Sequence, residues 1–246
     1  MKTSVVILTK NEERNIKKCL KSVYFSEEII LIDDYSTDKT VSIARRNGAK
    51  IYKRHLYDDF SKQRNFGLKK AKNKWVLFLD ADEVLSPELA KEIQSLGATD
   101  TQGYFLKRRD YFLNKKILGG ESGGVWLLRL GRKSAGKWDR AVHEHWEING
   151  KTQRLKNYLY HSPHPSFLSL ISKINYYSDL HAIENEKEGK NPSLIKIIFF
   201  PMAKFIYNFV FRLGLRDGTH GFVLAVAMSF HSFLSWSSLY LDDQKK

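Results

Sequence analysis

Short apolar runs alternate with longer stretches of helical spacing through the first hundred residues, and this alternation constrains the fold more than any other feature. The apolar runs are Ser4–Leu8, Ile29–Ile32, Ala49–Tyr52 and Trp75–Leu79. The stretches with helical spacing are Glu12–Val23, Thr37–Asn47, Ser61–Lys72 and Pro87–Leu96. Runs of Val, Ile and Leu without polar alternation are typical of strands buried on both faces. Strand and helix in turn predict an α/β fold, with a mixed, mainly parallel sheet flanked by helices.

Polar and acidic residues follow three of these runs, at the point where each predicted strand ends. They are Thr9–Glu13, Asp33–Asp38 and Asp80–Glu83. Ligands of parallel sheets bind beyond the carboxyl ends of the strands, so we expect the three clusters to line one cleft. This convergence is the strongest functional signal in the sequence.

The carboxylates of two of these clusters have separate candidate roles. Asp80 and Asp82 suit a hard cation, because Mg²⁺ and Mn²⁺ accept carboxylate oxygens and share the phosphates of a substrate. The stretch Asp33–Asp38 can accept hydrogen bonds from a ribose or from a base N–H. In both cases the structural alternative is a polar turn in which an Asp, Ser or Thr caps the next helix.

Two other segments carry candidate chemistry. Arg64 lies on a predicted helix and can pair with phosphate oxygens, although a solvated helix face is the simpler interpretation. Glu144 is the candidate base for an acceptor hydroxyl, and Asp139 is a rival. His143 is a candidate for the same proton chemistry or for metal binding, and it shares a face with His145 if residues 140–145 are extended. Satisfied polar residues in a strand are the alternative.

The chain divides by composition into residues 1–100, 101–165 and 166–246. In the middle part, Gly103–Arg109, Gly124–Leu130 and Leu155–Tyr160 are predicted strands of a more antiparallel extension. The last part is aromatic and basic, and we expect it to be helical.

Two apolar stretches of the last part are predicted helices. Within Leu194–Leu215, Lys196, Lys204, Asn208 and Arg212 fall within an arc of roughly 160°, which predicts a basic face. Pro201 is expected to kink or split this helix. Gly218–Leu241 contains no Asp, Glu, Lys or Arg, but its serines and histidines dilute it as a membrane span. We therefore predict helices that lie on a membrane or pack on the domain.

A formal net charge of +14 favours anionic partners. A nucleic-acid-binding protein is the non-enzyme alternative, but acidic residues cluster in the predicted cleft and no binding motif appears, so we expect no nucleic-acid partner. The single cysteine, Cys19, excludes an intrachain disulfide and is expected to be buried on a helix. The apolar run near the start is too short for a signal peptide, which predicts no export.

In its first hundred residues the chain resembles glycosyltransferase family 2, of the GT-A (Rossmann-like) fold. The matching stretches are Ser4–Glu13, Glu28–Thr40, Arg64–Gly67 and Trp75–Glu83, in the order and spacing of that family. The family commonly has Gly where this chain has Tyr35.

The resemblance implies inverting transfer of a sugar from a UDP-sugar with the help of Mg²⁺ or Mn²⁺. It places Asp82 as the main metal ligand, with Asp80 and His143 as further candidates, and Arg64 at the diphosphate. The implied nucleotide-sugar contacts also include Thr9, Asn11, Glu12, Asp33, Asp34, Ser36, Asp80 and Ala81.

Val142–Glu144 and Gly214–Phe222 resemble the subgroup that builds the lipopolysaccharide core. That resemblance implies transfer of glucose to a lipopolysaccharide-core or similar glycolipid or saccharide acceptor. A lipid-linked acceptor lies on an anionic membrane, and the aromatic, basic tail would bring the enzyme there, so we predict a cytoplasmic protein, peripheral on the inner face of the bacterial cytoplasmic membrane. Two alternatives use a similar donor site. One is transfer to a polyprenyl phosphate; two full transmembrane helices would support it, and they are not evident in the sequence. The other is nucleotidyl transfer.

Overall fold

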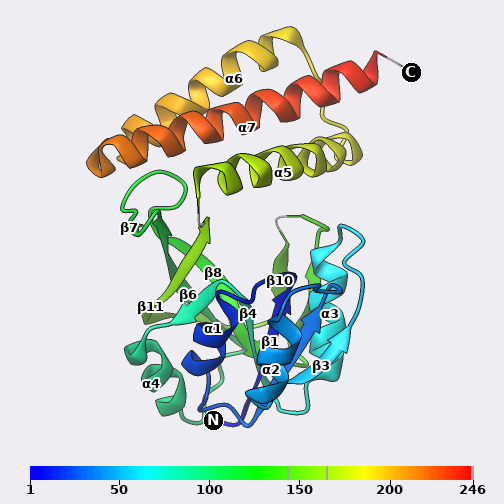
Figure 1. Cartoon of the computed structure of the whole chain (residues 1–246), viewed down its shortest axis with the longest axis vertical. Coiled ribbons are helices and arrows are strands. Elements are labelled where there is room, and N and C mark those ends of the chain that lie inside the picture. The colour runs from blue at the N-terminus through cyan, green and yellow to red at the C-terminus, as the bar shows by residue number, and fades with distance from the viewer. Residues whose placement is uncertain (143, 165, 245–246) are drawn as a thin grey trace. The chain divides into compact units, whose positions relative to one another are not determined.

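The computed structural model describes residues 1–142, 144–164 and 166–244, and the chain forms two compact units (Figure 1). Unit 1 comprises Met1–Arg108 and Trp126–His161, and unit 2 comprises Arg109–Val125 and Ser162–Lys246. Unit 1 therefore holds the predicted sheet, and unit 2 holds the predicted helical tail together with an inserted loop.

A mixed sheet forms the centre of unit 1. Its parallel strands are β1 (Thr3–Thr9), β2 (Glu28–Asp33), β3 (Lys50–Lys53) and β4 (Trp75–Asp80). Its other strands are β5 (Glu83–Leu85), β6 (Gly103–Phe112), β8 (Val125–Arg132) and β11 (Thr152–His164). The short strand β7 (Lys115–Lys116) pairs with the end of β6 and belongs to unit 2. The strand order is β3-β2-β1-β4-β8-β6-β11-β5, with β7 paired to β6. Because β8 runs antiparallel to β4, the predicted parallel half and its antiparallel extension are both confirmed.

Alternate residues of the central strands enter two different hydrophobic cores. Val5 and Ile7 pack with the helices α1 (Ile16–Ser22), α2 (Thr40–Arg46) and α4 (Pro87–Ser95). Val6 and Leu8 pack with α3 (Phe60–Lys70) and with a ribbon of β9 (Gly136–Asp139) and β10 (His145–Ile148). Since successive strand side chains point to opposite faces, strands covered on both sides must be apolar at every position.

The segment Arg64–Gly67 fixes α3 against its neighbouring strands. The side chain of Asn65 donates to the Trp138 carbonyl (2.8 Å) and accepts from the Trp138 N–H (2.9 Å), so it fixes β9 against α3. A Cβ on Gly67 would lie 2.4 Å from Cγ1 of Val6, so only glycine allows α3 to approach β1 this closely. Arg64 is 1% exposed, which excludes the solvated helix face considered for it.

Three predictions about local structure have clear outcomes. Ser86 followed by Pro87 predicts a helix start with Ser at the cap, and Ser86 does cap α4 by accepting from the Leu89 N–H (3.1 Å). Cys19 is fully buried, also as expected, and burial raises its pKa well above the ordinary value. The condition that residues 140–145 form one extended segment is not met, because Arg140 has φ +67° and β10 begins at His145. His143 lies outside the described residues.

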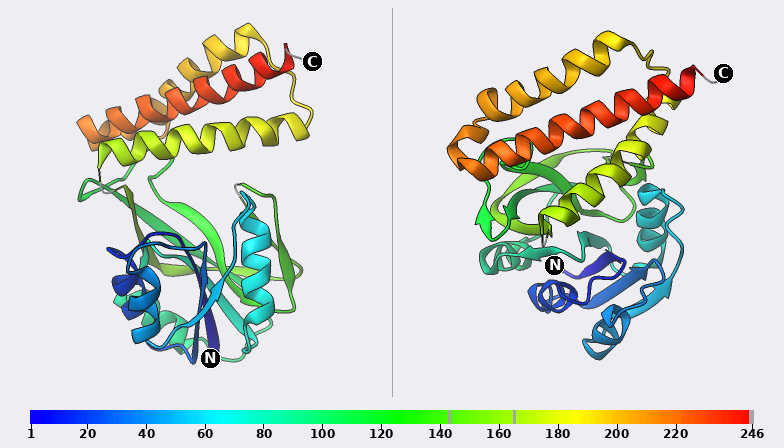
Figure 2. Two further views of the ribbon diagram at one scale, coloured as in Figure 1. Left: turned by 45° about the vertical axis from the view of Figure 1, so that its right-hand side comes forward. Right: turned by 45° about the horizontal axis from the view of Figure 1, so that its top comes forward.

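Unit 2 contains three helices that pack side by side (Figure 2). They are α5 (Phe167–Lys187), α6 (Leu194–Ile206), which continues into η1 (Tyr207–Phe211), and α7 (Thr219–Asp243). A small core of Phe112, Ile117, Leu170, Ile174 and Ala227 joins α5 and α7 to the inserted loop. Helix α6 runs through Pro201 without splitting there, and the Pro201 carbonyl accepts from Ser229 Oγ of α7 (2.8 Å).

The helices Leu194–Phe211 and Thr219–Asp243 are each long and apolar enough to cross a membrane, by length and composition alone. The expectation that two such helices are not evident is therefore wrong on this criterion.

Asp217 connects the tail to the inserted loop of unit 2. Its buried carboxylate accepts from the N–H groups of Leu118 (3.0 Å) and Gly119 (2.8 Å), and its carbonyl accepts from Lys115 Nζ (2.8 Å). A Cβ on Gly119 would lie 2.2 Å from the carbonyl oxygen of Leu213, so this contact requires glycine. The tail motif that includes Asp217 thus has a structural role, because it holds the tail to residues 115–119 of the inserted loop.

Candidate active site

Strand register brings the three polar clusters together at one edge of the sheet. Thr9 of β1 lies beside Asp33 of β2, and Leu8 lies beside Asp80 of β4. The Asp34 N–H donates to the Thr9 carbonyl (2.9 Å), and the Ala81 N–H donates to the Leu8 carbonyl (3.2 Å). The convergence expected from the sequence is therefore present.

The loops after β1 and β2 are joined by hydrogen bonds. The Asn11 N–H donates to Ser36 Oγ (2.9 Å), and Asn11 Oδ1 accepts from the Thr37 N–H (2.8 Å). The carboxylate of Asp33 accepts from both the N–H (3.1 Å) and the hydroxyl (2.5 Å) of Ser36, and the Glu12 N–H donates to Thr40 Oγ1 (2.7 Å). These bonds give the loops a fixed shape before any ligand binds.

Tyr35 and Asp34 lie in the second of these loops. Tyr35 has φ +51°, a left-handed conformation that glycine adopts more easily, and its ring stacks on His55 at 4.0 Å. Asp34 contacts Lys10 Nζ (2.8 Å) and the Leu56 N–H (3.2 Å). Burial raises the pKa of Asp34, but these hydrogen bonds and the charge of Lys10 outweigh burial and lower it.

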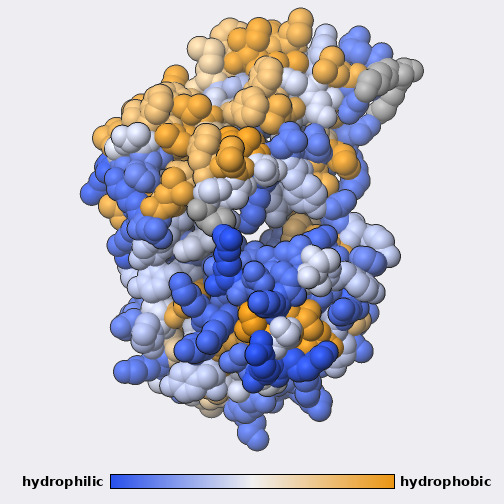
Figure 3. Space-filling view, in the orientation of Figure 1, coloured by the Kyte–Doolittle hydropathy of each residue, from blue (hydrophilic) through white to orange (hydrophobic). Residues whose placement is uncertain are grey.

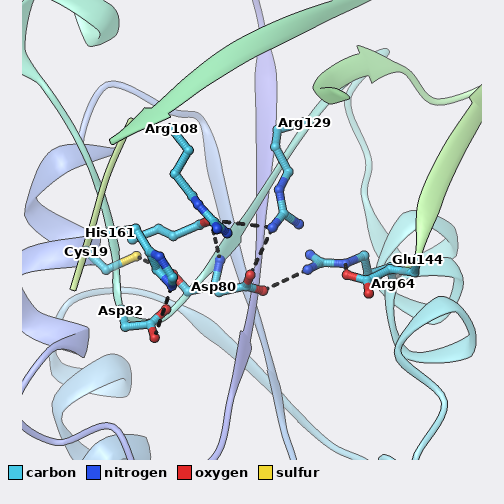
Figure 4. Close-up of polar contacts among 9 residues, drawn as sticks. Cys19, Arg64, Asp80, Asp82, Arg108, Arg129, Glu144 and His161 are labelled. Carbon is cyan, nitrogen blue, oxygen red and sulfur yellow. Dashed lines mark hydrogen bonds and ion pairs between the residues drawn. The ribbon is translucent and has the colours of Figure 1, made fainter. Parts of the chain in front are cut away.

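Asp80 is held between two arginines (Figure 4). Arg64 Nη2 donates to Oδ1 of Asp80 (2.8 Å), and Arg129 Nη2 donates to Oδ2 (2.9 Å). Burial raises the pKa of Asp80, but the charges of Arg64 and Arg129 outweigh burial and hold the pKa well below its ordinary value. Asp80 is therefore ionised, and both of its oxygens are engaged.

Glu83 lies beneath this pair and is fully buried. Its Oε2 accepts from the Asp80 N–H (3.0 Å), and its Oε1 lies 3.5 Å from Arg129 Nη2 and 3.9 Å from Arg108 Nη1. Burial raises the pKa of Glu83 above its ordinary value, with Arg129 opposing the rise and the negative charge of Asp80 adding to it. Glu83 thus holds the turn after β4 through the Asp80 N–H and lies close to the charges of Arg129 and Arg108.

Asp82 points to a different neighbour. Its Oδ2 lies 3.6 Å from Nε2 of His161, which β11 supplies (Figure 4). Carboxylate oxygen and imidazole nitrogen are both common ligands of divalent metals. Of the two aspartates of Asp80–Asp82, Asp82 is the better placed for a metal, because Asp80 already binds two guanidinium groups.

Glu144 joins the same network from the other side. Arg64 Nε donates to its Oε1 (2.8 Å), so one guanidinium bridges Glu144 and Asp80. Asp139 instead forms an exposed group with His145 and Glu147, whose ligand atoms lie within 4.8 Å of one another. The structure therefore groups Glu144, and not Asp139, with the residues at the end of β4.

The guanidinium groups of Arg64 and Arg129 are buried, and some of their N–H groups make no hydrogen bond to the described residues. Arg64 is 1% exposed and Arg129 is 5% exposed. Arg64 Nη1, Arg129 Nε and Arg129 Nη1 have no hydrogen-bond partner among residues 1–142, 144–164 and 166–244. The guanidinium of Arg64 also lies 4.8 Å from the ring centroid of Trp138. Buried unpaired donors of this kind are costly, and an anion with several oxygens would satisfy them.

Sequence reasoning missed two residues of this site. Arg129 carried a signal, because it interrupts the apolar run Val125–Leu130 with a charge. His161 carried none, since only the pairing of β11 with β5 brings it to Asp82.

The mixed, mainly parallel sheet with acidic turns at its strand ends is a GT-A-like fold. Comparison with protein families matches residues 4–166 to Glycosyl transferase family 2, and the chain belongs to that family.

Relatives extend the match over nearly the whole chain. An uncharacterized glycosyltransferase of Rickettsia typhi is 30% identical over 97% of this chain and 86% of its own length. The lipopolysaccharide core biosynthesis glycosyltransferase LpsC of Rhizobium meliloti is 30% identical over 96% of this chain and 91% of its own. A crystal structure of TarS from S. aureus superposes with a TM-score of 0.50 at 16% identity, covering 96% of this chain and 55% of TarS, which shows likeness of fold alone.

Proposed function

We propose that this family 2 glycosyltransferase moves a sugar, glucose in the first instance, from a UDP-sugar to a saccharide of the lipopolysaccharide core or a similar glycolipid. The observation that carries the proposal is the bridge from Asp80 through Arg64 to Glu144, which links the donor motif to a candidate base in one network. The lipopolysaccharide relative at 30% identity supports the choice of acceptor class.

In the proposed reaction the acceptor hydroxyl attacks the anomeric carbon from the side opposite the diphosphate, so the configuration inverts. Glu144 takes the hydroxyl proton on Oε2, because Oε1 is occupied by Arg64. The new bond joins the acceptor oxygen to the anomeric carbon, and the bond from that carbon to the phosphate oxygen breaks to release UDP. Asp139 is the alternative base in the proposal, although its exposed position favours it less.

The charges of Arg64 and Arg129 suit the departing diphosphate. Their buried unpaired N–H groups are placed to stabilise negative charge as it develops, where a fixed donor in a dry site is most effective. The contacts of Thr9, Asn11 and Ser36 with the nucleoside are proposed on the family resemblance and on the fixed shape of their loops.

A divalent Mg²⁺ or Mn²⁺ fits the residues present. Asp82 and His161 offer one oxygen and one nitrogen 3.6 Å apart, and each oxygen of Asp80 already accepts from an arginine. A bound metal would neutralise the diphosphate as it leaves.

A thermal-shift screen of nucleotide-sugars, each with and without Mn²⁺, tests donor and metal together. We expect the largest stabilisation from one UDP-sugar with Mn²⁺ and a much smaller one in the Asp82→Asn variant. Equal responses to all nucleotide-sugars, or a response that Asp82→Asn leaves unchanged, would contradict the donor site.

Transfer to a polyprenyl phosphate is a second candidate, favoured by the two helices long enough to cross a membrane. A soluble isoprenyl phosphate and a core oligosaccharide offered in the same reaction with the preferred UDP-sugar separate the two functions. Product on the isoprenyl phosphate alone would establish the second.

A further inference from the structure

Helix α6 exposes a continuous apolar face. Six of its residues share this face, and between 46% and 67% of each is exposed: Leu194, Ile195, Ile198, Phe199, Met202 and Ile206. At 100° per residue they fall within an arc of about 140° that contains no charged residue of the helix. We call these six residues the α6 stripe. Apolar surface gathered in this way marks a site of interaction.

The basic face predicted for this helix is not its most exposed one. Lys204 pairs with Glu121 of the inserted loop, and Lys196 lies 5.0 Å from the ring centroid of Trp236. Asn208 is 2% exposed, so it belongs to the interior. Contact with a partner would therefore be made by apolar side chains, with the lysines at their border.

Helix α7 widens the apolar surface. Phe222, Val226, Phe230 and Phe233 are each more than 40% exposed. An apolar groove of about 650 Å³ lies between α6 and α7, with Phe200, Ile206, Tyr207 and Phe211 in its lining. Ile206 belongs to both the α6 stripe and the groove, so the two surfaces are continuous. Figure 3 shows the hydrophobic side chains gathered over these helices.

We propose that the α6 stripe inserts among the acyl chains of an acidic lipid bilayer, with α6 lying in the plane of the membrane surface. Residues 194–241 contain four basic residues and one acidic residue, which favours an anionic lipid surface over a neutral one. Lysines bordering an apolar face reach the headgroups while their stems stay in the apolar layer. The proposal deepens the proposed function, since it brings the enzyme to a lipid-linked acceptor.

The packing of unit 2 favours this orientation over a helical hairpin across the bilayer. Helix α7 packs against both α6 and α5. The outer surface of α5 carries exposed charges, among them Asp179, Glu186 and Lys187. A transmembrane hairpin with α5 beside it would place those charges, and Lys196 and Lys204, in hydrocarbon, which membrane helices avoid. A helix with one apolar face and flanking lysines is suited to the interface instead.

Flotation of the full chain with vesicles of phosphatidylethanolamine and phosphatidylglycerol tests the proposal. We expect the double variant Ile198→Glu, Phe199→Glu to lower the partition coefficient at least tenfold, and Met202→Glu alone to lower it less. Tyr24→Glu is the matched control, because Tyr24 is an 80% exposed aromatic residue of unit 1, and it should leave partition unchanged. Binding by the wild type should persist in roughly 1 M NaCl, where the Debye length falls to about 3 Å and surface attraction is screened.

Three results would overturn the inference: equal partition of the double variant and the control, complete release of the wild type by high salt, or a dimer without vesicles that the double variant dissociates. A thermal shift by UDP, measured on the same variants, reports on unit 1 separately. If the wild type shows no such shift, the proposed function fails while the vesicle result stands. If the double variant keeps the thermal shift by UDP but no longer binds vesicles, the loss of membrane binding is due to the α6 stripe.

Discussion

The arginine pair around Asp80 predicts a pH-dependent loss of stability in the variant Arg129→Met. This substitution keeps much of the apolar volume and removes the charge. It leaves Asp80 with Arg64 alone, and it leaves the fully buried Glu83 with Arg108 at 3.9 Å. Removing one partner of a buried ion pair typically costs about 3–5 kcal/mol. Asp80 is 31% exposed, so we expect a loss near about 3 kcal/mol at pH 7, after allowing for solvent screening.

The loss should shrink in acid. The pKa of Asp80 is lowered in the folded protein, so its ion pairs stabilise the fold above the unfolded pKa and lose that contribution as pH falls through the folded value. The unfolded carboxyl titrates alike in both proteins, so the difference comes from the folded states: without Arg129 the pKa of Asp80 lies higher in the variant, which binds its proton first as pH falls. Up to about 1 kcal/mol of the loss should therefore be gone at pH 3. Arg129 also opposes the raised pKa of Glu83, so its removal makes the buried Glu83 carboxylate still less favourable at high pH, and this part of the loss likewise shrinks in acid.

Urea unfolding of the wild type and the variant at pH 7 and pH 3, followed by circular dichroism, measures both effects. Arg132→Met is the control on the same strand, because Arg132 donates to the carbonyls of Thr99 and Thr101, which do not titrate. The loss of unfolding free energy in Arg132→Met should be the same at pH 7 and pH 3. The reasoning is refuted if the loss in Arg129→Met is equally independent of pH, or if it stays below about 1 kcal/mol at pH 7.

Three further predictions concern single side chains. Asp82→Asn should lower kcat at least about a hundredfold with little change in the unfolding midpoint, since we propose that this carboxylate holds the metal; full turnover of the variant in a metal chelator would contradict the metal assignment. Glu144→Gln should lower kcat by roughly 10²–10⁴-fold without weakening donor binding, whereas Asp139→Asn should change kcat less than about threefold. The reverse pattern in a steady-state assay would make Asp139 the base. Asp217→Ala should destabilise unit 2 by about 1–3 kcal/mol, because the buried Gly119 N–H and the partly buried Leu118 N–H lose their acceptor. Hydrogen exchange at Leu118 and Gly119 should become faster, and unchanged exchange would exclude that anchoring role.

The sequence by itself determined the strand-and-helix alternation of unit 1. Strands covered on both faces must be apolar at every position, and this constraint is local enough to appear as runs such as Ser4–Leu8 and Trp75–Leu79. The meeting of Thr9, Asp33 and Asp80 at one sheet edge followed as well, because parallel strands end on the same side.

Tertiary structure alone decided the polar network of the site. Arg64, Asp80, Arg129 and Glu144 lie up to 80 residues apart in the chain, and no periodic pattern encodes which charges will face one another. The approach of His161 to Asp82 depends on an antiparallel pairing that has no turn signal in the sequence.

The face of α6 that meets solvent was also decided by packing. A helical wheel orders Lys196 and Lys204 around the axis but does not show which side the neighbouring helix covers. Contact with α7 and with Glu121 places the apolar residues, and not the lysines, on the most exposed side.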